Sequence, residues 1–145
     1  MFRGLVDTLR DETNLRALSS SLFNLGDARR QAGDLEGARV AFTEMLELDR
    51  ELAAGAPGGD ARRELELSLF HLGSLLLKLG EIGGARALLE ESLVHCRRAL
   101  AEADSPLWRA SLRDALESYA TCLELAGDAK GAEHARAEAR SLDDA

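Results

Sequence analysis

Five side chains of this sequence could ligate a metal ion, namely those of its three histidines and two cysteines. They are His71, His95, Cys96, Cys122 and His134. A structural zinc site needs four such ligands, which usually come in close pairs. His95 and Cys96 are adjacent, so on a helix they point about 100° apart, and no two of the five stand four residues apart. We therefore expect no metal and no cofactor, with Cys122 in the core and Cys96 partly buried.

Residues for nucleophilic or phosphate chemistry are present, but their spacing does not form a site. Ser19, Ser20 and Ser21 lie in a helical stretch, with no histidine placed to activate a hydroxyl. The glycines cluster at expected helix corners, and no strand precedes them as it would in a phosphate-binding loop. Most carboxylates fall on solvent-facing helical positions, where a run of charge is usually solvated. We predict that the chain is not an enzyme.

The composition indicates one all-α domain. The chain has 145 residues, 46% of them hydrophobic, with only two prolines and a net charge of −8. Its Leu, Ala, Glu and Arg residues are strong helix formers. Nucleic acids and anionic membranes are unexpected partners, because both attract clustered positive charge. The N-terminus lacks a long apolar run, and the two cysteines are not closely paired, so we expect a cytoplasmic protein with reduced thiols.

A seven-residue motif recurs three times at intervals of 47 residues. It reads GDLEGAR from Gly33, GEIGGAR from Gly80 and GDAKGAE from Gly127. A glycine can adopt the left-handed conformation that ends a helix, and an acidic residue after it can cap or favour the next helix. Those acidic residues are Asp34, Glu81 and Asp128. Each motif therefore predicts a tight corner between two helices.

Six amphipathic helices are expected to flank these corners. The first helices of the three pairs should span 14–32, 60–79 and 106–126, and the second helices 36–54, 83–103 and 130–142. Ser105 before Pro106 marks a helix start, and Asp60 is expected to cap its helix in the same way. Residues 1–12 should form a short helix that covers the first long one with Phe2, Leu5, Val6 and Leu9. The repeats then occupy 13–55, 60–104 and 105–142.

Large and small residues follow one pattern within each repeat. The first repeat has Leu22, Leu25, Gly26, Gly33, Ala38 and Phe42; the second has Leu69, Leu72, Gly73, Gly80, Ala85 and Leu89; the third has Leu116, Tyr119, Ala120, Gly127, Ala132 and Arg136. This pattern resembles the tetratricopeptide repeat over nearly the whole chain. The resemblance implies a right-handed α-solenoid of three helix pairs. The small residues Gly26, Gly73 and Ala120 should let the paired helices approach closely, opposite Ala38, Ala85 and Ala132.

Two features depart from the family pattern. The period is 47 residues rather than about 34, so the helices should be longer, as in a long-repeat bacterial form. Arg136 stands where a large apolar residue belongs, and the final helix is polar, as the end of a solenoid requires. A longer parent protein, cut at this point, is the alternative. The richness in Arg, Ala, Gly and Leu indicates a GC-rich bacterial genome.

The resemblance also implies a concave groove, lined by the first helix of each pair, that holds a partner peptide or protein segment. Its residues would be Phe23, Asn24, Asp27 and Arg30 in the first repeat, Leu67, Phe70, His71, Ser74 and Lys78 in the second, and Asp114, Glu117, Thr121 and Glu124 in the third. Phe23 and Phe70 lie outside the positions needed to pack paired helices, so we interpret them as apolar anchors. Packing between neighbouring first helices is an equal alternative for both rings.

Acidic residues outnumber basic ones in this groove, so we expect a partner with apolar anchors and net positive charge. The leading hypothesis is thus a non-enzymatic protein-binding adaptor. One alternative is a structural homodimer that associates through exposed apolar ends. Another is a small chaperone for a secreted or aggregation-prone client.

Overall fold

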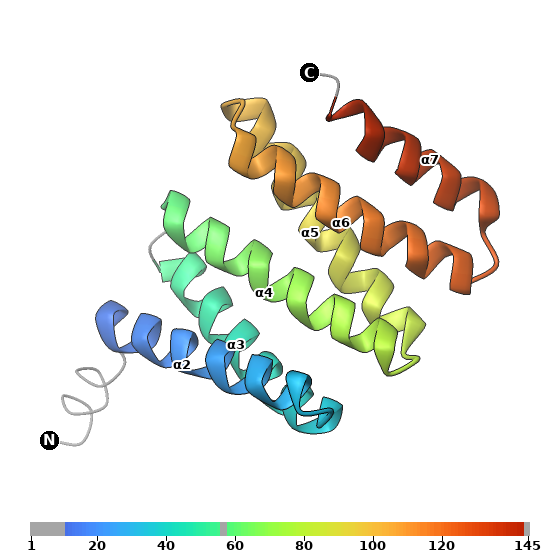
Figure 1. Cartoon of the computed structure of the whole chain (residues 1–145). Helices are drawn as coiled ribbons and strands as arrows, with labels where there is room; N and C mark the ends of the chain where they lie inside the picture. Colours follow the sequence, from blue (N-terminus) through green and yellow to red (C-terminus); the bar gives the residue numbers. More distant parts are fainter. Residues whose placement is uncertain (1–10, 56–57, 144–145) are drawn as a thin grey trace, which may run out of the picture. The chain divides into compact units, whose positions relative to one another are not determined.

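A computed structural model of the chain describes residues 11–55 and 58–143, and within these ranges it contains six helices and no strand (Figure 1). The helices are α2 (Glu12–Gln31), α3 (Leu35–Gly55), α4 (Gly59–Lys78), α5 (Ile82–Glu102), α6 (Pro106–Leu125) and α7 (Ala129–Ser141). Every boundary lies within two residues of its expected position. The segment 1–10, where the short helix with Phe2, Leu5, Val6 and Leu9 is expected, lies outside the described residues.

The three predicted corners are confirmed. Gly33, Gly80 and Gly127 have φ angles of 85°, 80° and 88°. Residues that carry a Cβ atom rarely adopt φ angles in this positive region. After Gly33, the Asp34 amide donates to the Arg29 carbonyl at 2.8 Å, and the Gly33 amide donates to the Arg30 carbonyl at 3.1 Å. The same two bonds recur at Gly80 and Gly127. Each glycine therefore closes a helix by satisfying carbonyls that would otherwise lack an intrahelical partner.

Polar caps start several of the helices. The Oδ1 atom of Asp34 accepts from the Gly37 amide at 2.9 Å, and Oδ1 of Asp128 accepts from the Gly131 amide at 2.9 Å. Glu81, whose side chain is one methylene longer, makes no capping hydrogen bond.

The two expected starts outside the corners differ in outcome. The Ser105 hydroxyl caps α6 as predicted, by accepting from the Leu107 amide at 3.2 Å, and Pro106 follows at the first helical position. The prediction that Asp60 caps its helix is wrong, because α4 already begins at Gly59. Asp60 lies in the first turn, where a carboxylate is favourable beside the positive end of the helix dipole.

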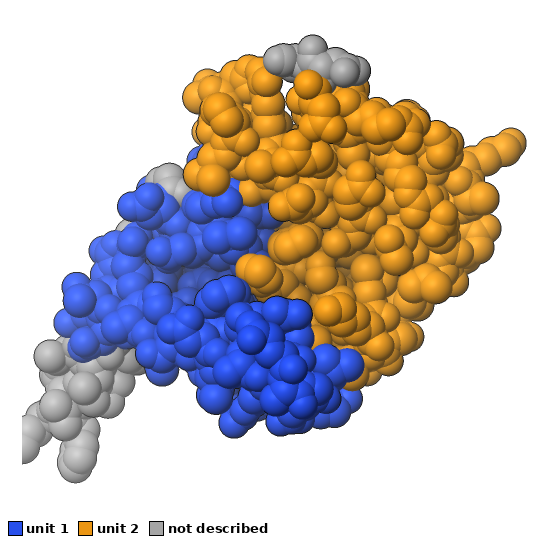
Figure 2. Space-filling model, viewed as in Figure 1, with its two compact units in different colours: residues 1–68 blue, residues 69–145 orange. Residues whose placement is uncertain are grey.

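The chain divides into two compact units, Met1–Ser68 and Leu69–Ala145, which Figure 2 colours separately. The boundary falls inside α4. In the first unit α2 packs on α3, and in the second unit α6 packs on both α5 and α7. Consecutive helices thus pack in pairs, as in a helical-repeat solenoid, and the all-α fold class is confirmed. A single domain and the right-handed superhelix stay predictions.

Glycines make room for the largest side chains between paired helices. A Cβ atom on Gly26 would lie 2.6 Å from Cδ1 of Phe42, and one on Gly73 would lie 3.0 Å from Cγ of Leu89. Phe42 and Leu89 are both fully buried. The small residues of the pattern are therefore matched to the large residue that the second helix of the same pair inserts, in line with close packing in protein interiors.

Candidate functional site

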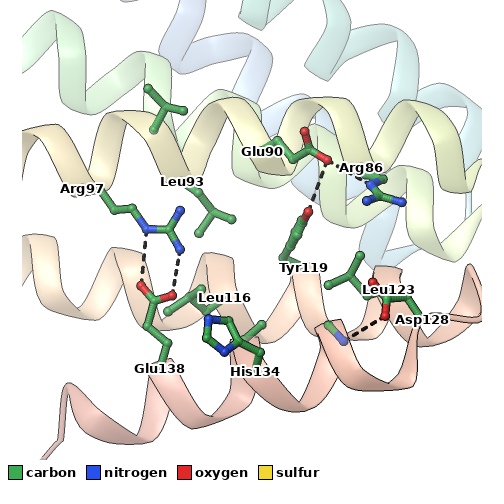
Figure 3. A pocket seen from close by; sticks show the side chains of 13 residues that line it. Arg86, Glu90, Leu93, Arg97, Leu116, Tyr119, Leu123, Asp128, His134 and Glu138 are labelled. Carbon is green, nitrogen blue, oxygen red and sulfur yellow. Dashed lines mark hydrogen bonds and ion pairs between the residues drawn. The ribbon is translucent and has the colours of Figure 1, made fainter.

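The second unit contains a pocket of about 590 Å³ between α5, α6 and α7 (Figure 3). Its apolar lining includes Leu93 from α5 and Leu116 and Leu123 from α6, all buried. Its polar lining comprises Arg86, Glu90, Arg97, Tyr119, Asp128, His134 and Glu138. A volume of this size lies within the range of pockets that bind small molecules or peptide side chains.

At one end of the pocket, Glu90 accepts two hydrogen bonds. Nε of Arg86 donates to Oε1 of Glu90 at 2.9 Å, and the Tyr119 hydroxyl donates to the same oxygen at 3.2 Å. Burial, followed by the Glu90 carboxylate, raises the pKa of the Tyr119 phenol above its usual value. Tyr119 therefore stays protonated at neutral pH and acts as a hydrogen-bond donor.

A second polar contact joins the two outer helices of the pocket. Nη2 of Arg97 lies 2.8 Å from Oε1 of Glu138, and Nε donates to the other carboxylate oxygen at 3.3 Å. Figure 3 shows this pair linking α5 to α7. Among the described lining residues there is no serine, cysteine or lysine to act as a nucleophile.

The pocket lies outside the predicted groove, since none of the groove residues lines it. Part of its α7 wall is formed by Gly131 and Ala135. One period earlier, the residues at these positions are Gly84 and Leu88. Ala135 is smaller than Leu88, the residue one period earlier, and this difference was the signal in the sequence for the pocket.

The predicted groove residues on α2 are partly used for packing and pairing. Asn24 is exposed, whereas Phe23, Asp27 and Arg30 are half-buried. The Phe23 ring stacks on Phe42 of α3 with ring centroids 6.2 Å apart and planes 21° apart. The expectation that Phe23 lies outside the packing of paired helices is therefore wrong. Asp27 pairs with Arg30, whose Nη2 lies 2.6 Å from Oδ1.

On α4, the predicted groove residues are divided between the two units. Leu67 belongs to the first unit, and Phe70, His71, Ser74 and Lys78 belong to the second. Phe70 is partly buried against the core of the second unit, with its ring centroid 5.5 Å from that of His71. The hydroxyls of Ser74 and of Ser118 in α6 lie 3.2 Å apart, which brings the predicted groove faces of α4 and α6 together within this unit.

On α6, the predicted groove residues form an exposed polar stripe. Asp114, Glu117, Thr121 and Glu124 are spaced by three, four and three residues and are all exposed. A hydrogen bond from Arg136 of α7 lowers the pKa of the Glu124 carboxyl. The hydrogen bond to Glu124, and to a lesser extent the nearby Glu117 carboxylate, raise the pKa of the Arg136 guanidinium, so Arg136 offsets part of the negative charge of the stripe.

A buried acidic cluster in the first unit was not predicted. Asp49 of α3 is 2% exposed and accepts hydrogen bonds from the hydroxyls of Ser19 in α2, at 2.7 Å, and Ser68 in α4. Asp49 and the buried Glu66, whose Oε2 lies 3.5 Å from Nη1 of Arg63, are exceptions to the expectation that most carboxylates face solvent. Asp49 falls in the helical spacing of the buried residues of α3. This spacing was the sequence signal that its carboxylate is buried.

One carboxyl of this cluster has an altered acidity. Burial raises the pKa of Glu64, and the nearby Arg16 guanidinium partly offsets that rise. Ser19, which has no histidine placed to activate it in the sequence, instead donates its hydroxyl hydrogen bond to Asp49. The cluster holds the helices of the first unit together through charge-assisted hydrogen bonds.

Both cysteines are buried. Cys122 lies in the core as expected, whereas Cys96 is fully rather than partly buried, because α6 and α7 complete the core around it. Burial raises the pKa of the Cys122 thiol, which disfavours the reactive thiolate. In the part of the chain that the structure describes, no three His, Cys, Asp or Glu side chains converge as a metal site would require. No described helix is sufficiently long and apolar to cross a membrane.

Paired helices joined by corners with the same left-handed glycine and the same two backbone hydrogen bonds are the architecture of a helical-repeat protein. The family model for the tetratricopeptide repeat matches residues 19–52, which run from α2 to α3 and contain the first corner. Residues 19–52 thus carry a tetratricopeptide repeat, and the left-handed glycine of its corner recurs at Gly80 and Gly127. Neither curated proteins nor solved structures gave a match.

Proposed function

We propose that this chain is a non-enzymatic protein-binding module that holds a partner segment on the exposed faces of α2, α4 and α6. The observation that carries this proposal is the tetratricopeptide repeat at residues 19–52, followed by two further helix pairs with the same corner. Stacked helix pairs of this kind offer extended surfaces for another protein.

The proposed partner segment carries basic residues beside apolar anchors. Its basic residues would face the acidic stripe of α6, in which Asp114 and Glu117 are exposed. In the unit that carries this stripe, an apolar anchor would lie near the half-buried Phe70 of α4; in the first unit, the half-buried Leu67 and Phe23 are the proposed anchor positions, and the Phe23 ring also stacks on Phe42. Charge complementarity of this kind mainly speeds association and selects the partner.

A selection from a random peptide library tests the proposal and does not require the natural partner. Peptides retained by the purified protein should share large apolar residues flanked by Lys or Arg. The variant Asp114→Lys with Glu117→Lys should bind them at least about tenfold more weakly, equivalent to about 1.4 kcal/mol.

The chain offers a matched control. Glu44 and Glu47 on α3 have the same spacing as Asp114 and Glu117 and are also exposed, but they lie on a second helix. Glu44→Lys with Glu47→Lys makes nearly the same change in net charge and should leave binding within about twofold. Equal losses in both variants, or selected peptides rich in acidic residues, would contradict the proposed surface.

A further inference from the structure

The pocket between α5, α6 and α7 shares no lining residue with the surface proposed for a protein partner. Its volume is about 590 Å³. A water molecule takes up about 30 Å³ in the liquid, so the pocket has room for roughly twenty of them. One side chain of a partner protein would fill only part of this space, whereas small-molecule sites have volumes of about 300–1,000 Å³. The size of the pocket therefore points to a small molecule.

The apolar part of the lining comes mainly from α5 and α6. Leu93 of α5 and Leu123 of α6 are buried, and Val94 of α5, which also lines the pocket, is 49% exposed. Replacing water beside such side chains by an apolar group is favourable. A ligand of this pocket should therefore have an apolar body.

The charged lining residues lie at the two ends of the pocket. Arg97 of α5 contacts Glu138 of α7 at 2.8 Å. Arg86 comes eleven residues before Arg97, and Asp128 comes ten residues before Glu138, which correspond to about 16 Å and about 15 Å along a helix. Arg86 and Asp128 therefore share one end of the pocket, and the pair of Arg97 with Glu138 forms the other end (Figure 3).

Negative charge is in excess at the end that holds Asp128. Counting histidine as neutral at pH 7, the lining contains three acidic residues and two basic ones. Arg97 and Glu138 offset each other at their end. At the opposite end Arg86 offsets Glu90, because its Nε donates to Oε1 of Glu90 at 2.9 Å. The carboxylate of Asp128 is then the additional negative charge.

An aromatic ring at the same end also suits a cation. Tyr119 of α6 is half-buried, and its hydroxyl donates to Oε1 of Glu90 at 3.2 Å. The face of a tyrosine ring attracts cations. An anion, in contrast, is disfavoured by the excess of carboxylates in the pocket and by the net charge of −8 on the chain.

We propose that this pocket binds a small organic cation, made of an ammonium group on an apolar body. The ammonium group lies at the end that holds Glu90, Asp128 and Tyr119. The apolar body lies against the leucines of α5 and α6 and extends toward the other end of the pocket. This site is separate from the proposed partner surface and does not depend on it.

NMR titration of the full chain with matched probes tests the proposal. Phenylbutylamine, phenylbutanol and phenylbutyrate share one apolar body and differ in the charge of the head group, whereas methylamine has the charge without the body. Phenylbutylamine should bind at least about tenfold more tightly than phenylbutyrate and than methylamine. Its shifts should centre on Glu90, Tyr119 and His134.

Three results of this titration would overturn the proposal. The first is equal or tighter binding of phenylbutyrate or methylamine. The second is the absence of shifts at the pocket residues with phenylbutylamine at up to about 10 mM, a concentration that suits fragments of this size. The third is a set of shifts confined to Asp114 and Glu117, which would assign the cation to the acidic surface of α6.

A pair of variants separates the pocket from the overall charge of the protein. Glu90→Gln alters an exposed side chain, so the fold should be retained. It should weaken phenylbutylamine at least about fivefold and change phenylbutanol by less than about twofold. Glu102→Gln makes the same change in net charge at an exposed position of α5 outside the lining, and it should leave both probes within about twofold. Equal losses of phenylbutylamine binding in the two variants, or none in either, would overturn the proposal.

Discussion

Replacing Gly26 by alanine tests the packing of the first helix pair. The added methyl carbon would lie 2.6 Å from Cδ1 of Phe42, whereas apolar carbons prefer separations of about 3.5–4.0 Å. Phe42 is fully buried and stacks on Phe23, so its ring has little freedom to move away. Overpacking of this kind costs about 1–3 kcal/mol, and alanine recovers about 0.5–1 kcal/mol through its higher helix propensity. We therefore expect Gly26→Ala to lose up to about 2.5 kcal/mol of unfolding free energy and not to gain any.

Gly73→Ala in the second pair is the matched comparison. Its methyl would lie 3.0 Å from Cγ of Leu89, and a small shift of that flexible side chain relieves the contact, so the net change should stay within about 0.5 kcal/mol. Urea denaturation followed by far-UV circular dichroism measures both variants. Phe42→Leu should reduce the cost of Gly26→Ala, giving a coupling energy of at least about 0.5 kcal/mol in a double-mutant cycle. Stabilisation by Gly26→Ala, or no coupling to Phe42, would refute this packing.

Three further outcomes follow from the buried polar groups. Asp49→Ala removes the acceptor of two buried serine hydroxyls and should cost about 1–3 kcal/mol in urea denaturation, whereas Asp49→Asn, which keeps one acceptor oxygen, should cost less; equal losses would contradict the hydrogen-bonded role of the carboxylate. The pKa of Glu64 is raised in the folded state, so its ionised form opposes folding at neutral pH and this penalty disappears as the pH falls through the folded pKa to below its ordinary value of 4.5. Glu64→Gln should therefore be more stable than the parent at pH 7 and should lose that advantage in acid, which denaturation across pH measures; an advantage that grows in acid would reverse the sign. Cys96 and Cys122 should react slowly with a thiol reagent in the folded protein and rapidly in denaturant, because both are buried; rapid labelling of the native chain would contradict their burial.

Local signals in the sequence were sufficient for the helices and corners. The left-handed glycines at Gly33, Gly80 and Gly127, together with the capping Ser105, act within a few residues, so spacing alone located them. Asp60 was predicted to cap its helix, but α4 begins one residue earlier, at Gly59. An acidic residue is favourable both at the cap and in the first turn, so the sequence does not distinguish the two positions here.

The candidate site depended on contacts between helices, which periodicity does not identify. Asp49 occupies an apolar position, but its partners Ser19 and Ser68 come from two other helices. Phe23 repeats in register with Phe70, yet the repeat did not show that its ring stacks on Phe42. The pocket of the second unit is lined by three helices, and Ala135 in place of a leucine indicated only its α7 side.

Chemical-shift mapping by NMR with a selected basic peptide tests the central claim most directly. The proposed surface predicts shifts for Asn24, His71, Asp114 and Glu117, on the first helix of each pair. Residues such as Glu44 and Glu47 on α3 should keep their resonances unchanged. Shifts confined to the pocket residues Arg97, His134 and Glu138, with none on α2, α4 or α6 at the predicted positions, would contradict the proposed binding surface.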